Sequence, residues 1–192
     1  IVGVDDSGSY GYRPERPFAT WDYAVGQCTA SRGDTLVILP GHAETVTLAI
    51  TMDVAGVRVI GLGEGRGRPA ITASGAIDAV TVTAANCRIH NIRFVAATSV
   101  TAQINVAAAD LVVSGGVLEQ GAGPLTAMTV ASGGNRLTVK DCLFLGTAAG
   151  PDFAIDFEAG VSNPTIAGCT FNYSPNDIDT ACIRANANAV SG

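Results

Sequence analysis

Aromatic and charged residues are scarce in this chain, at 6% and 15% of its 192 residues. Lysine occurs once, at Lys140, beside ten arginines, and the formal net charge is −6. Such an acidic surface repels phosphates, so we expect no general nucleic-acid binding. No apolar run approaches the ~20 residues of a membrane-spanning helix. The opening Ile1-Val2-Gly3-Val4, with acids at Asp5 and Asp6, does not resemble a signal peptide.

The chain has no CxxC motif and no cluster of cysteine with histidine. Its five cysteines are Cys28, Cys87, Cys142, Cys169 and Cys182. Zinc sites need such ligands at short spacings, so we expect neither a metal site nor a cofactor. The five thiols are odd in number and far apart, in apolar surroundings. This pattern favours reduced core residues in a protein that is assembled in a cytoplasm.

Aliphatic residues and glycines are what the chain has in abundance. Hydrophobic residues make up 47% of the sequence, and 23 glycines are spread along it. Val, Ile, Leu and Ala suit short stacked strands, and dispersed glycines indicate many turns. The length suits one domain.

An apolar anchor position recurs every 24 to 30 residues, which is typical of solenoid repeats. The anchors are Val59, Ile89, Val113, Val139 and Ile166. Two positions earlier stand Val57, Cys87, Leu111, Leu137 and Pro164, and five positions later Glu64, Phe94, Leu118, Phe144 and Phe171. A further strand precedes each unit, with the pairs Leu48/Ile50, Val80/Val82, Ile104/Val106, Met128/Val130 and Ile155/Phe157. This alternation predicts three half-buried strands in each coil.

Corner residues recur in phase with the anchors. Three positions before them lie Gly56, Asn86, Asp110, Arg136 and Asn163, and two positions after them Gly61, Asn91, Gly115, Asp141 and Gly168. Most of these residues tolerate the left-handed backbone that a tight corner requires. We therefore predict an all-β fold, a parallel β-helix of about six rungs with equivalent strands stacked about 4.8 Å apart. A β-sandwich, the alternative, does not explain corners that recur in phase.

An amphipathic helix is expected before the first coil. Thr20 is a suitable N-cap for a helix that begins at Trp21 and ends at Gly33. Such a helix would cover the open end of the core. We divide the single domain into an N-terminal extension with this helix (1–33), the rungs (34–184) and a C-terminal tail (185–192).

Two segments near the N-terminus resemble a known family. Pro17-Phe18-Ala19-Thr20-Trp21 and the run from Gly33-Asp34-Thr35 to Pro40-Gly41 are similar to the opening of pectate-lyase-like right-handed β-helices. The run Pro40-Gly41-His42-Ala43-Glu44-Thr45 resembles the versions found in tailed-phage virion proteins. The motif covers residues 14–46, and the repeat extends the likeness in fold through residue 184. The resemblance implies a right-handed parallel β-helix, but it is a weak guide to function because one fold carries many functions.

Enzymes of the family that this chain resembles use clustered carboxylates, sometimes with calcium and a basic residue, because sugar cleavage needs an acid and a base or nucleophile. The first candidate pair is Asp156 with Glu158, and the second is Asp177 with Asp179. The alternative is that both pairs lie on solvated outer faces. Connections as short as residues 146–153 and 172–180 hardly wall a deep pocket, so we favour no catalytic residue.

Other polar residues have both a functional and a structural interpretation. Arg88, His90 and Arg93 form either a small basic patch that pairs with a carboxylate or an ordinary outer face. His42 and Glu44 form either an acid–base pair or a contact that stabilises a turn. The glycine-rich run 61–67 resembles a phosphate loop, but Pro69 and a strand follow it where a helix would be needed.

We expect a noncatalytic virion structural protein, above all a capsid decoration (cement) protein, located in the virion after assembly in the host cytoplasm. Its partners would be the major capsid protein or another virion protein, and in some settings a surface glycan. Two alternatives stay open: a tailspike-like glycan depolymerase or polysaccharide lyase, and a carbohydrate-binding module of a host-recognition fibre. The resemblance also implies a homotrimer. An open end near Ile183 and the outer apolar residues Val95, Leu143 and Leu145 would favour one.

Overall fold

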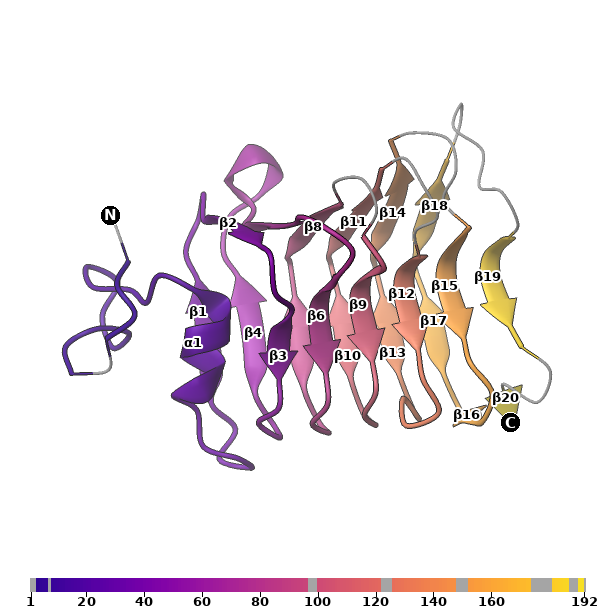
Figure 1. Ribbon diagram of the computed structural model, residues 1–192, viewed down its shortest axis with the longest axis horizontal. Helices are drawn as coiled ribbons and strands as arrows, with labels where there is room; N and C mark the ends of the chain where they lie inside the picture. Colours follow the sequence, from indigo (N-terminus) through magenta and orange to yellow (C-terminus); the bar gives the residue numbers. More distant parts are fainter. Residues whose placement is uncertain are drawn as a thin grey trace.

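The structure is a parallel β-solenoid of about five turns with one short helix near its N-terminus (Figure 1). The computed structural model describes residues 3–6, 8–96, 100–121, 126–147, 152–173, 181–186 and 190–191. Three parallel sheets, each of six stacked strands, run the length of the solenoid. The predicted fold class is therefore confirmed, and the expected six rungs correspond to six strands in each sheet.

Each coil contributes one strand to every sheet. Sheet 1 contains β1 (Thr35–Ile38), β4 (Arg58–Gly61), β7 (Arg88–His90), β10 (Val112–Ser114), β13 (Thr138–Lys140) and β17 (Thr165–Ala167). Sheet 2 contains β2 (Ala43–Val46), β5 (Ala70–Ala73), β8 (Arg93–Ala96), β11 (Val117–Gln120), β14 (Leu143–Gly146) and β18 (Thr170–Asn172). Sheet 3 contains β3 (Ile50–Met52), β6 (Asp78–Val82), β9 (Ala102–Val106), β12 (Thr126–Val130), β15 (Phe153–Phe157) and β19 (Ala181–Ala185).

The anchor column is the register of sheet 1. Val59 pairs with Ile89, which pairs with Val113, and Val139 and Ile166 follow in the same row. Leu36 adds a first member, because it pairs with Val59. The anchors from Val59 to Val139 are buried, since alternate side chains of each strand point into the solenoid.

Two of the predicted columns are wrong in their first rung. In sheet 2, Phe94 pairs with Ile71 and not with Glu64, because the turn containing the 3₁₀ helix η1 (Gly65–Gly67) lengthens the first repeat. In sheet 3, Ile50 pairs with Val80 and Met52 with Val82, so the predicted pair Leu48/Ile50 is displaced by two residues. Leu48 lies outside the core and is 82% exposed.

The first corner is confirmed at all five positions. Gly56, Asn86, Asp110, Arg136 and Asn163 all have positive φ, between 51° and 80°. Arginine rarely adopts this conformation. The Arg136 side chain donates two hydrogen bonds to the Asp110 carboxylate one rung away, at 2.7 and 2.6 Å. In the second corner Gly61 is the exception, because it lies within β4 and has no positive φ.

Helix α1 (Trp21–Gly26) is much shorter than predicted. Thr20 is its N-cap and accepts a hydrogen bond from the Tyr23 N–H, as expected. The helix ends at Gly26 and not at Gly33, because Gln27 is its C-cap and the backbone turns there. Trp21 and Val25 are buried and close the first coil.

The last rung of the core is less buried than the rung before it. Val139, Phe144 and Ile155 are fully buried, whereas their partners in the last rung, Ile166 and Phe171, are half-buried and Ile183 is 42% exposed. The region predicted to be a tail contains the short strand β20 (Val190–Ser191), which pairs with β16 (Val161–Ser162).

The five cysteines are free thiols. Cys142 and Cys169 occupy equivalent positions in adjacent rungs, because the next residues, Leu143 and Thr170, are register partners. Burial raises the pKa of Cys142 to about 11 and also raises the pKa of Cys87. At pH 8 a thiol with a pKa of about 11 is only ~0.1% thiolate, the reactive form.

The cysteines differ in burial, and this difference predicts the order in which a thiol reagent modifies them. At pH 8 a thiol reagent should modify the half-buried Cys169 and Cys182 first and the buried Cys87 and Cys142 last. Peptide mass spectrometry after timed quenching gives the order. All five thiols should react after unfolding. Fewer than five modified cysteines would contradict the finding that all five are free thiols.

Candidate functional site

The two acids of the first predicted pair, Asp156 and Glu158, lie in different surroundings. Asp156 is in β15 and only 7% exposed, so the expectation of a solvated side chain is wrong for it. Its register partner on β19, Arg184, donates from Nε to Oδ1 at 2.7 Å and from Nη2 to Oδ2. The guanidinium also lies over the Phe153 ring, 3.9 Å from its centroid. Glu158 follows the strand and is exposed, as expected.

Asp156 therefore has a structural partner that joins the last two strands of sheet 3. Its carboxylate accepts two charge-assisted hydrogen bonds, and neither Asp156 nor Glu158 lines either hollow described below. The second pair, Asp177 with Asp179, lies outside the described residues.

The predicted basic patch does not form as one cluster. Arg88 and His90 are on β7 in sheet 1, whereas Arg93 is on β8 in sheet 2. Arg93 makes a bidentate ion pair with Glu119, at 2.7 and 2.8 Å, and His90 Nδ1 lies 3.0 Å from Ser114 Oγ. Only Arg88 remains without an ion-pair or hydrogen-bond partner among the described residues.

Glu44 has a structural role that links the helix to the first rung. It pairs with Ile71 and therefore stands in the inward column of sheet 2. Its Oε2 accepts a hydrogen bond from the Trp21 N–H and lies 3.1 Å from His42 Nε2. The carboxylate thus satisfies a free donor in the first turn of α1. The structural interpretation of His42 and Glu44 is the one that this geometry supports.

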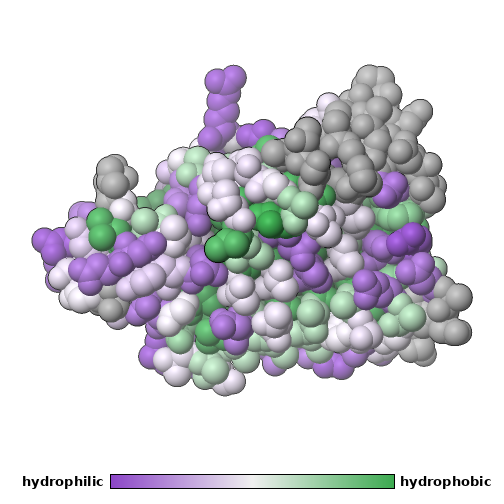
Figure 2. Space-filling view, in the orientation of Figure 1, coloured by the Kyte–Doolittle hydropathy of each residue, from purple (hydrophilic) through white to green (hydrophobic). Residues whose placement is uncertain are grey.

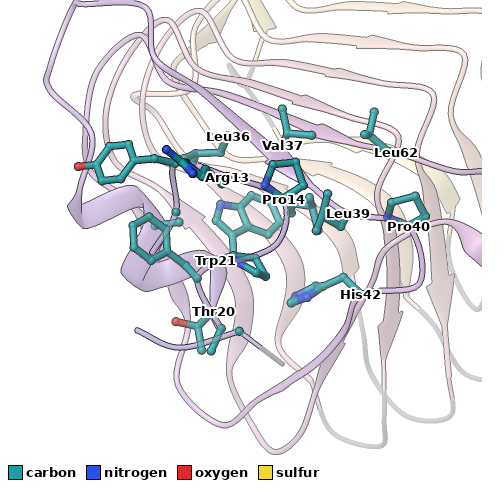
Figure 3. Close-up of a pocket in the computed structure, with 18 of the residues that line it drawn as sticks. Arg13, Pro14, Thr20, Trp21, Leu36, Val37, Leu39, Pro40, His42 and Leu62 are labelled. Atoms are coloured by element: carbon teal, nitrogen blue, oxygen red, sulfur yellow. The ribbon is translucent and has the colours of Figure 1, made fainter. Parts of the chain in front are cut away.

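A hollow of about 710 Å³ lies between the N-terminal arm and β1. All four β1 residues line it, together with Tyr12, Pro14, Phe18 and Trp21. In Figure 3, Trp21 lies at the centre and His42 at the edge, while Val37 and Leu62 project in the same direction at the rim. Tyr12, Val37 and Leu62 are 79%, 51% and 42% exposed, an unusual concentration of accessible apolar side chains.

The hollow follows an unpaired strand edge. β1 is the first strand of sheet 1 and, among the strands that the structure describes, pairs only with β4, so the backbone groups on its other side have no partner strand there. The Trp21 Nε1–H in the wall of the hollow is buried and has no acceptor among the described residues. Leaving such a donor unsatisfied costs about 1–3 kcal/mol.

A second hollow, about 700 Å³ in volume, runs along the outer side of sheet 1 and the first corner. Its lining is mainly polar and includes Arg58, Asn86, Arg88 and Arg136. Sequence reasoning singled out Arg88 but missed Arg58. The signal was present, because both arginines directly precede an anchor residue and so belong to one row.

No protein-family model matches this chain, and neither does any curated protein or solved structure. In the part of the chain that the structure describes, no group of three or more His, Cys, Asp or Glu residues is placed to hold a metal ion. Among the same residues, no helix is both long and apolar enough to cross a membrane.

The environment of the first acid pair generates a prediction with two parts. Asp156→Asn should lower the free energy of unfolding by about 1 kcal/mol, because it weakens the ion pair between the buried Asp156 carboxylate and the partly exposed Arg184. Glu158→Gln should leave the free energy of unfolding unchanged. Urea titration of both variants measures the two values.

The double variant should also keep the function of the protein. A glycan-cleaving activity of the wild type that disappears in the double variant would favour a depolymerase, since neither amide acts as a base or nucleophile.

Proposed function

We propose that this protein is a noncatalytic structural protein of a phage particle, a capsid decoration protein that attaches through its N-terminal end. The observation that carries the proposal is the hollow along the free edge of β1, with its exposed apolar rim. The phage particle as the setting is proposed from the resemblance of the run Pro40-Gly41-His42-Ala43-Glu44-Thr45 to tailed-phage virion proteins. Pro40, Gly41 and His42 of that run also line the hollow.

The proposed occupant is an extended segment of the partner virion protein. An extended chain can add to the free edge of β1 by backbone hydrogen bonds, and side-chain contacts then give specificity. Val37 and Leu62 would contact alternate apolar side chains of that segment. A volume of about 710 Å³ is in the range that accommodates several side chains.

The rest of the solenoid suits a rigid body that stands on a shell. Each inner coil pairs its three strands with the coils on both sides, so the structure is one continuous unit of stacked backbone. On the face formed by sheet 3, hydrophobic surface is broken into small areas between hydrophilic ones (Figure 2).

Substitutions at the rim test attachment. Val37→Lys combined with Leu62→Lys should abolish cosedimentation with purified particles from which the protein has been stripped, because two charges would be buried at the contact. Leu48→Lys is the matched control, since Leu48 is exposed but lies away from the hollow. Its binding should equal that of the wild type. Equal binding by all three proteins would exclude the β1 edge as the attachment site.

Location tests the function independently of the attachment site. Electron microscopy of intact particles should show the protein as density on the capsid exterior. Density on the tail would favour the fibre or tailspike alternatives, and absence from particles would exclude a virion role.

The expected homotrimer is a separate prediction. The half-buried outer residues Val95, Leu143 and Leu145 on sheet 2 and the exposed Ile183 would gain from burial between copies. Light scattering of the isolated protein should give three times the mass of one chain. A protein that stays monomeric at high concentration and still binds stripped capsids would contradict the trimer and leave the decoration role intact.

A further inference from the structure

We infer that the outer groove of sheet 1 is an oxyanion-binding site, with Arg58 and Arg88 as the two residues that hold the anion. This inference is independent of the proposed function and of the hollow at the N-terminal end. The ligand class is a sulfate, phosphate or carboxylate group, either free or carried on a polymer.

The two arginines face the same groove from adjacent rungs. Arg58 on β4 and Arg88 on β7 are register partners, and both side chains point outward, because Val59 and Ile89 beside them point into the core. Neighbouring strands are about 4.8 Å apart, so the two guanidinium groups can reach one ligand. Both arginines are exposed and line the groove.

This pair is an exception among the charges on the solenoid. Arg93 with Glu119, Arg136 with Asp110 and Arg184 with Asp156 each join a cation to an anion on the adjacent rung. Arg58 and Arg88 instead place two like charges directly opposite each other, which is unfavourable. Neither has an ion-pair partner among the described residues. An anion between them would remove the repulsion.

The remaining lining keeps the groove positive. Asp110 is the acidic residue in the lining, and Arg136 neutralises it. Hydrogen bonds from Arg136 hold the pKa of the Asp110 carboxyl below its ordinary value, so the carboxylate stays ionised and paired with Arg136. Arg58 and Arg88 therefore contribute uncompensated positive charge on a protein whose formal net charge is −6.

The chemistry of arginine specifies the ligand. A guanidinium presents a planar fork of N–H donors that matches the oxygens of carboxylates, sulfates and phosphates. Asn86, Ser31 and Thr138 also line the groove and supply further polar groups. The groove spans several rungs in an open surface, so it can admit an oxyanion that is attached to a chain.

Titration calorimetry at low ionic strength tests the site with two probes, sodium sulfate and dextran sulfate, with neutral dextran as the blank. We expect saturable binding of dextran sulfate by the wild type. Arg58→Gln with Arg88→Gln should weaken it roughly tenfold or more, since charge-assisted hydrogen bonds are lost. Arg66→Gln is the matched control, because Arg66 is an exposed arginine on the η1 turn, outside the groove. It should bind like the wild type.

A conservative variant separates charge from geometry. Arg58→Lys with Arg88→Lys keeps both charges but loses the planar forks, so its affinity should fall between those of the wild type and the glutamine variant. Circular dichroism should show that all variants keep the β fold, since the substituted side chains point outward. Saturable binding of sodium sulfate would show that a free ion suffices, and binding of dextran sulfate alone would assign the site to polymer-borne anions. Equal affinity of the glutamine double variant and the Arg66→Gln control would overturn the inference.

Discussion

The structure depends on one constraint, the parallel pairing of each strand with its equivalent one rung away. This pairing places residues 23 to 30 positions apart in direct contact and repeats that contact from rung to rung. The inward columns then form a continuous core, such as Ile71, Phe94, Leu118, Phe144 and Phe171 in sheet 2. The last two rings of this column stack with centroids 4.8 Å apart.

The same constraint leaves strand edges and core residues without a partner at the two ends of the solenoid. A stack of strands leaves one edge unpaired at each end and exposes the core there. At the N-terminal end α1 covers the core through Trp21 and Val25, and Glu44 binds the first turn of the helix from within an inward column. The edge of β1 nevertheless stays free beside the hollow. The proposed attachment site is thus a direct consequence of ending a solenoid.

Stacking also decides which surface residues meet. The ion pairs of Arg93, Arg136 and Arg184 connect adjacent rungs, and each contributes modestly because it is partly exposed. Their arrangement supports the register, since opposite charges in neighbouring strands attract. Arg58 and Arg88 violate this rule in an outer groove that is lined mainly by polar groups. A local conflict of this kind is expected where a protein binds a ligand.

The sequence by itself determined the solenoid, because burial of one strand face and the left-handed corners both leave a residue pattern with a fixed phase. It therefore predicted the anchor row, the first corner and the Thr20 cap. It did not determine the first rung, where the η1 turn shifts the repeat by several residues and replaces Glu64 with Ile71 in the column. The partners of outward side chains were decided only by the tertiary structure. Asp156 was predicted beside Glu158, its neighbour along the chain, but it pairs with Arg184, 28 residues away. Contacts between rungs outweigh sequence proximity, because positions i and i+2 along a strand are about 7 Å apart while equivalent positions in adjacent rungs lie only about 4.8 Å apart.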